Sequence, residues 1–229
     1  MRLTLDPTSM TDYRTFLKVK ALPNYRIVGR KAEFPDEYAA TLGIETDSID
    51  LPDYHPSAFL FDYQKAIARM AIQKQKFAIF ADCGMGKTLI YAEFIQYVRK
   101  ALPPNAAVLI VSPLMVVRQT MEEFRHFYGD GLPVEQVRAR DLGSWLSGGA
   151  GTVGITNYEA LADDVQPGRL AALVIDESSM LKSHYGKWGR TILRLGRGLS
   201  WKLCGTGTPA PNDRIEYANH AAFLNAEPN

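Results

Sequence analysis

The chain has 229 residues and a net charge of +1, with 46% hydrophobic and 22% charged residues. These values are typical of one large α/β domain, or of one domain with a substantial extension. They exclude a chain that is basic overall, so a nucleic-acid-binding surface would have to be a local patch. Cys83 and Cys204 have no partners at metal-ligand spacing, which predicts a reduced, cytoplasmic protein. No hydrophobic run reaches the length of a membrane span, so we expect no membrane partner.

Residues 1–55 form an N-terminal accessory segment whose charge is unevenly distributed. Every charged residue from 14 to 31 is basic, and every one from 33 to 53 is acidic. Tyr13, Phe16 and Tyr25 are interleaved with the basic residues. Two interpretations remain open: a nucleic-acid-contacting arm whose aromatic rings stack on bases, or a small accessory layer with a solvated charged face. The charge pattern alone favours the second interpretation.

A glycine-rich segment at residues 81–88 lies between an apolar run at 77–80 and a stretch with helical periodicity at 89–95. Strand, glycine-rich loop, Lys-Thr and helix in this order predict a phosphate-binding loop (P-loop). Gly84 and Gly86 let the backbone curl so that its amide groups face a polyphosphate. Lys87 would reach the β- and γ-phosphates, and the Thr88 hydroxyl would coordinate Mg²⁺. One departure is Ala81, which stands where the motif has its first glycine. The residues expected to contact the nucleotide here are Cys83, Gly84, Met85, Gly86, Lys87 and Thr88.

A second acidic signal follows the apolar run 173–175, where Asp176 and Glu177 come at the end of a predicted strand. This is the Walker B arrangement, in which the aspartate holds the Mg²⁺ shell and the glutamate orients and deprotonates the attacking water. The alternative, two acidic residues that cap a loop, is disfavoured by the P-loop upstream. Buried strands are also predicted at 107–111 and 201–204, and a mobile loop at 145–151.

Gln64 precedes the first helix and strand of the predicted nucleotide-binding domain. A glutamine amide can pair with the adenine edge, with N6 as donor and N7 as acceptor. Most glutamines in such a place are surface residues, so this signal by itself is weak.

Taken together, the order of these segments resembles a superfamily 2 helicase. Its Q motif and motifs I, Ia, Ib, II and III are matched in order by residues 63–64, 81–88, 111–113, 156–158, 176–179 and 207–209. Within that superfamily the sequence looks most like the Swi/Snf-type branch and its phage and bacterial relatives. The resemblance covers about residues 58–224, and it implies a bacterial or phage-infected cell.

The resemblance implies a role for each matching residue. ATP and Mg²⁺ would be the cofactors, with Gln64 at the adenine, Asp176 on the metal, and Glu177 and Lys87 as catalytic residues. Motif III would couple the ATP state to the track through Gly207 and Thr208. Nucleic acid, with duplex DNA favoured over RNA, would meet Pro113, Arg118, Thr156, Asn157 and Tyr158. Arg118 could equally be an ordinary helix-surface arginine. Motif II departs from its relatives by ending in Ser178-Ser179.

The fold implied by the resemblance is a RecA-like α/β domain at residues 56–229, with a mainly parallel sheet and helices on both faces. The family's motor has two such lobes, and motifs IV to VI have no counterpart after Asn212. We therefore expect a fragment that binds ATP as a first motor lobe of a DNA-dependent ATPase and needs a second lobe, in cis or in trans. The alternative is a free-standing ATP-binding switch or recruitment module. A P-loop small-molecule kinase is disfavoured, because it leaves motifs II and III unexplained.

Overall fold

The computed structural model describes residues 2–34, 38, 42–43, 54–148, 152–181, 187–210 and 217–225. Contacts divide the chain into two compact units, an N-terminal unit, Met1–Pro52, and a large unit, Asp53–Asn229. Each unit has its own hydrophobic core. Among the described residues, none of the helices combines the length and the apolar character needed to cross a bilayer.

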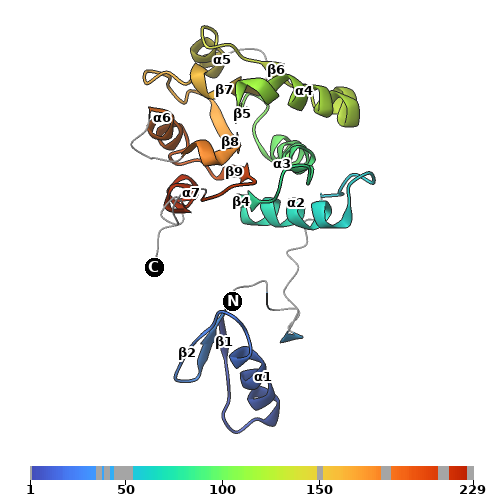
Figure 1. The fold of residues 1–229 in the computed structure, drawn as a ribbon, viewed down its shortest axis with the longest axis vertical. Helices are drawn as coiled ribbons and strands as arrows, with labels where there is room; N and C mark the ends of the chain where they lie inside the picture. The colour runs from blue at the N-terminus through green and yellow to red at the C-terminus, as the bar shows by residue number, and fades with distance from the viewer. Residues whose placement is uncertain are drawn as a thin grey trace. The chain divides into compact units, whose positions relative to one another are not determined.

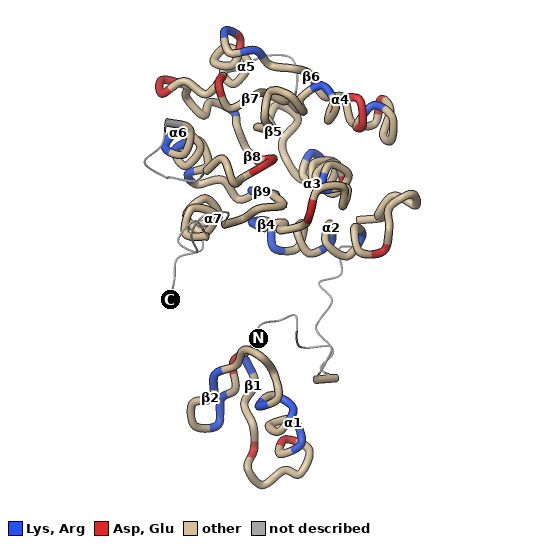
Figure 2. Tube along the Cα trace, viewed as in Figure 1, with Lys and Arg blue, Asp and Glu red and all other residues tan. Residues whose placement is uncertain are grey.

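The N-terminal unit is a small antiparallel sheet with one helix packed on it. Its elements are β1 (Arg2–Thr4), α1 (Met10–Lys20), β2 (Arg26–Val28) and β3 (Lys31–Glu33), and the strand order is β1-β3-β2. The helix begins after Ser9, whose hydroxyl accepts a hydrogen bond from the Asp12 amide, as is usual for an N-cap serine. Val19 of α1 packs in one cluster with Ala32 and Ile27 of the sheet. The basic stretch 14–31 therefore runs from α1 through β2 into β3, where Figure 2 shows its blue segments.

The large unit is built on a six-stranded sheet in which every neighbouring pair is parallel. The strand order is β4-β9-β8-β5-β7-β6. The strands are β4 (Lys76–Phe80), β5 (Ala107–Ser112), β6 (Glu135–Gln136), β7 (Val153–Asn157), β8 (Leu170–Asp176) and β9 (Trp201–Thr206). The prediction of a mainly parallel sheet is confirmed, and the continuous apolar run of β5 is buried at every position, as expected for an inner parallel strand.

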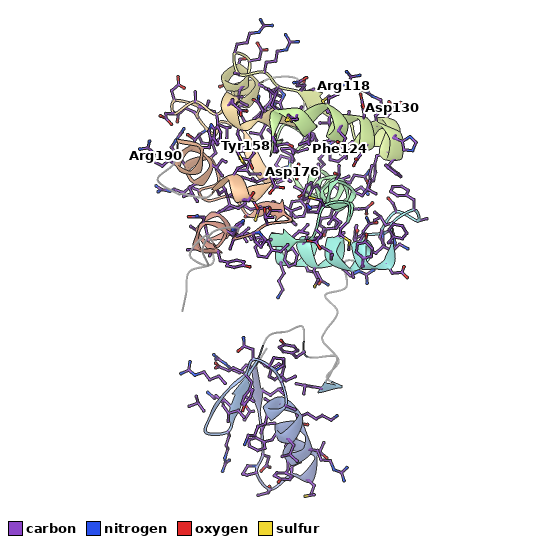
Figure 3. All side chains as sticks on the ribbon, viewed as in Figure 1. Arg118, Phe124, Asp130, Tyr158, Asp176 and Arg190 are labelled. Atoms are coloured by element: carbon purple, nitrogen blue, oxygen red, sulfur yellow. The ribbon has the colours of Figure 1, made fainter. Side chains whose placement is uncertain are left out.

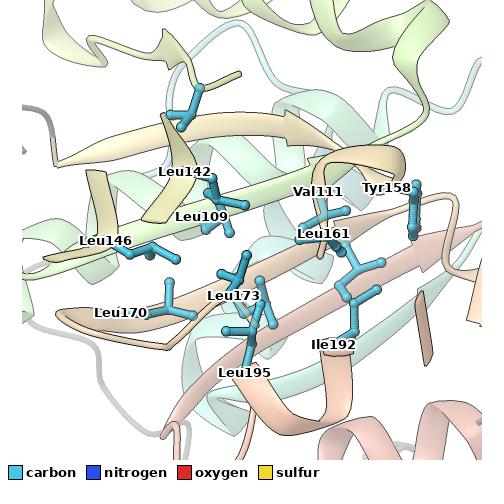
Figure 4. Packing of buried hydrophobic residues seen from close by; sticks show 14 of the residues in the cluster. Leu109, Val111, Leu142, Leu146, Tyr158, Leu161, Leu170, Leu173, Ile192 and Leu195 are labelled. Carbon is cyan, nitrogen blue, oxygen red and sulfur yellow. The ribbon is translucent and has the colours of Figure 1, made fainter. Parts of the chain in front are cut away.

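Helices cover both faces of this sheet (Figure 1). On one side lie α2 (Asp62–Lys74), α3 (Lys87–Ala101) and α4 (Leu114–Tyr128), which contact one another in turn. Phe124 of α4, labelled in Figure 3, is buried there. On the other side α5 (Leu142–Gly148), α6 (Lys187–Leu195) and α7 (Tyr217–Leu224) share one core cluster with β5 and β8. Figure 4 shows Leu109 and Leu173 of these strands packed with Leu146, Ile192 and Leu195 of the helices. Short 3-10 turns follow α4 (Gly129–Gly131), β7 (Tyr158–Ala160) and β8 (Ser178–Leu181).

The prediction of a mobile loop at 145–151 is wrong for its first half, because residues up to Gly148 belong to α5. Trp145 and Leu146 are buried and anchor this helix to the sheet. The Trp145 indole donates a 2.6 Å hydrogen bond to the Glu135 carboxylate, and its ring lies against Gly154, where a Cβ would come within 2.8 Å of it. Residues 149–151 lie outside the described part of the chain.

Candidate nucleotide-binding site

Five adjacent parallel strands bring their carboxyl ends to one edge of the sheet. These ends are Phe80, Thr206, Asp176, Ser112 and Asn157, in the spatial order of the strands. In an open α/β sheet this edge is where ligands bind. The residues that follow the strands therefore define the candidate site, and Figure 3 shows Asp176 and Tyr158 within it.

The loop between β4 and α3 has the backbone shape that a P-loop requires. Gly84 and Gly86 have φ values of +83° and +66°, in the left-handed region that only glycine adopts readily. Gly86 is also the residue that precedes the first turn of α3, so free amide groups and the positive end of the helix dipole point toward the loop. A Cβ on Gly86 would collide with the Gln64 amide nitrogen, so glycine is needed there for space as well.

Lys87 lies at the first position of α3, and its side chain folds back over the loop. Its ammonium donates hydrogen bonds to the carbonyl oxygens of Ala81 and Asp82, at 2.8 Å and 3.1 Å. Thr88 follows it in the first turn, and Cys83 is exposed on the loop. The Lys87 cation thus lies beside the curve of the loop and Thr88 is the next residue of the helix, while their binding of phosphate and metal stays a prediction.

Gln64 is hydrogen-bonded to the backbone of the P-loop, a role that was not predicted from the sequence. Its side chain is 2% exposed; the amide oxygen accepts from the Phe61 amide at 3.0 Å and the amide nitrogen donates to the Met85 carbonyl at 3.3 Å. Tyr63 donates to the same Met85 carbonyl at 3.2 Å, and its ring stacks on the exposed ring of Phe61. Each end of the Gln64 amide already has one partner, so adenine pairing stays a prediction for its remaining hydrogen-bonding positions.

Asp176 ends β8, and three donors hold its carboxylate. One oxygen accepts from the Ser112 hydroxyl at 2.9 Å, and the other accepts from the Tyr91 hydroxyl at 3.2 Å and from the Glu177 amide at 3.0 Å. Burial raises the pKa of Asp176, and the hydrogen bonds from Ser112 and Tyr91 oppose that rise. The result is a fixed carboxylate oxygen pair at the sheet edge, which suits a hard cation such as Mg²⁺.

Glu177 follows in a left-handed backbone conformation, with φ of +53°, that is uncommon for a residue other than glycine. One oxygen of its carboxylate accepts from the Ser179 and Thr206 hydroxyls, both at 2.5 Å. The Thr206 hydroxyl in turn accepts from the Thr208 amide at 3.0 Å. A hydrogen-bonded relay, Thr208–Thr206–Glu177, therefore joins motif III to the predicted catalytic base.

Ser178 faces the opposite way, into the core. Its hydroxyl lies 3.0 Å from the His220 ring on α7. The two serines of motif II thus have different partners: Ser179 is hydrogen-bonded to Glu177, and Ser178 contacts His220 of α7.

Tyr91 was not predicted as a member of the site, and Ser112 and Thr206 were not predicted as hydrogen-bond partners of Asp176 and Glu177. One signal for Tyr91 was present in β9, where a glycine inside a strand often marks a close approach. Gly205 pairs with Asp176 in the sheet, and a Cβ on Gly205 would collide with the Tyr91 hydroxyl. The Tyr91 ring therefore crosses β9 at Gly205 to reach Asp176.

The predicted nucleic-acid contacts divide into exposed and buried residues. Pro113 is the N-cap residue of α4, and the first two residues of the helix, Leu114 and Met115, are exposed. Arg118 is exposed on the same helix, where it pairs with Glu122 at 2.7 Å, as a surface arginine would.

The side chains of Thr156 and Tyr158 are buried, so their predicted contact with nucleic acid stays a prediction for the backbone of these residues alone. The Thr156 hydroxyl donates to the Val137 carbonyl at 2.7 Å, and the Tyr158 hydroxyl donates to the Asp176 carbonyl at 2.7 Å. Tyr158 is thus a support of motif II. The Asn157 side chain accepts from the Ala160 amide at 3.1 Å and caps the turn that follows β7.

The donor set fits a magnesium ion that arrives with a nucleotide. No group of three or more His, Cys, Asp or Glu side chains among the described residues could hold a metal on its own. Mg²⁺ is usually bound in proteins by one or two carboxylates together with substrate phosphates and water. Asp176 and the Thr88 hydroxyl supply oxygen donors of this kind.

Comparison with known proteins places residues 58–189 in the family described as type III restriction enzyme, res subunit. The fold resembles the Sulfolobus solfataricus SWI2/SNF2 ATPase core in complex with double-stranded DNA, with 23% identity and a TM-score of 0.62 over 75% of this chain and 37% of that one. It also resembles the Pyrococcus furiosus Hef helicase domain, with 18% identity and a TM-score of 0.57 over 71% of this chain and 36% of that one. No curated protein matches the sequence.

The chain spans little more than a third of each of these two structures. The matched family segment holds the P-loop and the Asp176–Glu177 pair, and the fold around them is the predicted RecA-like one. The chain thus belongs to the type III restriction enzyme res subunit family, within the superfamily 2 helicases.

Proposed function

We propose that this chain is the ATP-binding first lobe of a DNA-dependent ATPase motor of the helicase or translocase type. The observation that carries the proposal is the convergence, at one sheet edge, of the P-loop with Lys87 and of Asp176 and Glu177, with Glu177 hydrogen-bonded to motif III. A strand-end acidic pair that merely capped a loop would not need this relay.

The P-loop would bind the nucleotide and order its phosphates. The amides around Gly84 and Gly86 would face a bound polyphosphate, and Lys87 would exchange its carbonyl partners for the β- and γ-phosphate oxygens. Thr88 and Asp176 would hold Mg²⁺, which would neutralise the charge that develops on the phosphate oxygens as the γ-phosphoryl group passes to water and ADP leaves. The hydrogen bonds from Ser112 and Tyr91 keep Asp176 pointed toward that position.

Glu177 would act as the base that orients and deprotonates the attacking water. Its carboxylate is held by Ser179 and Thr206, so a displacement of motif III changes the direction in which the base points. Coupling would pass from Gly207 and Thr208 through Thr206 to Glu177.

The track would be nucleic acid, with duplex DNA favoured over RNA. Support comes from the related SWI2/SNF2 core, which was solved with double-stranded DNA. On this chain the exposed start of α4 at Pro113, the Arg118 side chain and the edge at Asn157 are the proposed contacts. The free thiols of Cys83 and Cys204 are consistent with the proposed cytoplasmic setting. The proposal of a bacterial or phage-infected cell rests on the sequence resemblance alone.

Efficient turnover would need a second RecA-like lobe. Arginine fingers in such motors are worth about 10³–10⁵ in turnover. We therefore propose that this chain alone binds ATP·Mg weakly and hydrolyses it very slowly. The second candidate function, an ATP-binding switch without motor activity, has the same nucleotide site but predicts no response of hydrolysis to DNA.

Nucleotide binding tests the first step. Fluorescent ATP with Mg²⁺ is titrated into the chain and into Lys87→Ala and Glu177→Gln variants. The proposal predicts that Lys87→Ala weakens binding at least about tenfold, because the phosphate cation is lost, whereas Glu177→Gln binds normally. Equal affinity of Lys87→Ala and the unaltered chain would contradict the proposed site.

A further inference from the structure

The N-terminal unit presents an open sheet face that the ATPase proposal does not use. Side chains alternate along its strands, and Leu3, Ile27 and Ala32 point into the core that α1 covers. The opposite face of the sheet carries Arg2, Thr4, Arg26, Val28, Lys31 and Glu33. Val28 is 60% exposed on it, so this face of the sheet is open at β2.

The charge of this face is mainly positive. Among the strand residues of this face, Arg2, Arg26 and Lys31 are basic and Glu33 is acidic. Arg2 forms a 2.7 Å ion pair with Glu33, while neither Arg26 nor Lys31 has an ion pair with any acidic residue in the described ranges. Lys31 lies opposite Val28, two positions along the sheet from Arg26, so the two cations are about 8 Å apart at their Cα atoms.

An aromatic residue lies at the end of the sheet, beside Arg26. Tyr25 immediately precedes β2 and is 38% exposed. A shallow hollow of about 520 Å³ is lined by Arg2, Asn24, Tyr25, Arg26, Glu33 and Phe34. Tyr25 and Asn24 thus line one hollow with Arg26 and with the ion pair of Arg2 and Glu33.

We propose that this open sheet face binds single-stranded nucleic acid. Arg26 and Lys31 contact successive stretches of the phosphate backbone, and an unpaired base stacks on Tyr25. Exposed aromatic rings beside a basic groove are how proteins hold single strands without reading sequence, and stacking of this kind requires a base that is not paired. An acidic peptide would satisfy the cations but would leave the ring and the hollow without a role.

The proposal goes beyond the motor function and is independent of ATP. The matched family segment begins at residue 58, so it does not include this unit. The outer side of α1 offers a matched control surface, since Arg14 and Lys18 are exposed there, on the helix that packs against the other face of the sheet.

The test is fluorescence anisotropy of a labelled oligothymidylate titrated with the full chain in the absence of nucleotide. Two variants exchange two positive charges for two negative ones: Arg26→Glu with Lys31→Glu, and Arg14→Glu with Lys18→Glu. The sheet variant should weaken binding at least about tenfold and reduce the slope of log affinity against log salt by about 1.4, whereas the helix variant should change affinity less than about threefold. Arg26→Gln with Lys31→Gln gives the same direction if charge reversal disturbs folding.

The stacking contact is tested by comparing Tyr25→Ala with Tyr13→Ala. The Tyr13 side chain is also exposed, but it lies on α1. Tyr25→Ala should weaken single-strand binding about 5- to 100-fold, and Tyr13→Ala should not. Oligouridylate and a duplex of equal length are run beside the oligothymidylate, to separate RNA from DNA and single from double strands.

Lys87→Ala should leave single-strand binding in the absence of nucleotide unchanged. An error in the proposed ATP site would therefore appear in the nucleotide titration, and an error in the proposed sheet face would appear in the oligonucleotide titration. Equal losses in the sheet and helix variants, or duplex binding as tight as single-strand binding with no effect of Tyr25→Ala, would overturn the proposal.

Discussion

Gly205→Ala should damage the site without touching a predicted catalytic residue. A Cβ at Gly205 would overlap the Tyr91 hydroxyl and lie 2.8 Å and 3.0 Å from two carbons of the Tyr91 ring. The ring must then leave β9, and its hydrogen bond to Asp176 is lost. Overpacking costs about 1–3 kcal/mol and a lost hydrogen bond to a carboxylate about 1.5–3 kcal/mol, so the free energy of unfolding should fall by about 3–5 kcal/mol.

Urea unfolding measures this loss in the right part of the chain. All three tryptophans, Trp145, Trp188 and Trp201, lie in the large unit, so their fluorescence reports its unfolding alone. Gly207→Ala is the matched control, because a Cβ there would meet its neighbours at 3.5 Å, an ordinary contact distance.

The Tyr91→Leu substitution tests the mechanism by a double-mutant cycle. Removing the ring takes away the atoms with which the Gly205 methyl collides, so the double variant should be at least about 1 kcal/mol more stable than the sum of the single losses predicts. Strict additivity, or a Gly205→Ala variant as stable as Gly207→Ala, would refute the reasoning.

Three further predictions follow from single contacts. Cys83 is exposed, whereas Cys204 is fully buried and burial raises its pKa to about 12. A thiol reagent should therefore label Cys83 fast and Cys204 only on unfolding, and ATP·Mg should slow the labelling of Cys83. Rapid labelling of both thiols would contradict the fold. The Glu93 carboxylate accepts hydrogen bonds from Tyr54, Ser57 and Tyr128. Glu93→Gln should therefore lower the free energy of unfolding by about 1.5–3 kcal/mol in urea titrations. A loss below about 0.5 kcal/mol would show that these hydrogen bonds do not stabilise the fold. Burial lowers the pKa of Lys202 from its ordinary value of 10.5 to about 8, so between these two pH values the unfolded chain binds more protons than the folded one. The free energy of unfolding of the unaltered chain, relative to Lys202→Met, should therefore rise with pH across this interval. A fall would contradict the lowered pKa of Lys202.

The sequence was sufficient for the parts of the site that are contiguous in the chain. Lys87 and Thr88 are placed by the spacing of the glycines before them, and Asp176 and Glu177 by the end of an apolar strand. Parallel strands end at one edge, so the prediction that these two segments meet there followed from the fold class alone.

Contacts made across the sheet could not be predicted in the same way. Tyr91 lies on the buried side of α3, where its ring reads as ordinary core, and its bond to Asp176 depends on the register of β8 and β9. Thr206 likewise reaches Glu177 only because β9 lies beside β8.

Tyr158 shows the limit of reasoning by motif position. Its place in the chain matches motif Ib, but side-chain direction is a tertiary property, and the ring packs beneath motif II with its hydroxyl on the Asp176 carbonyl. The helix α5 was not predicted for a related reason: its glycines and serines suggest a loop, whereas the burial of Leu142, Trp145 and Leu146 stabilises it.

The most direct test of the central claim is steady-state ATP hydrolysis with and without duplex DNA. It is measured for this chain and for a longer chain that adds a second RecA-like lobe, each beside its Lys87→Ala variant. The account predicts very slow hydrolysis by this chain and DNA-stimulated hydrolysis by the longer one that Lys87→Ala abolishes. Hydrolysis by the longer chain that ignores DNA, or that survives Lys87→Ala, would contradict it.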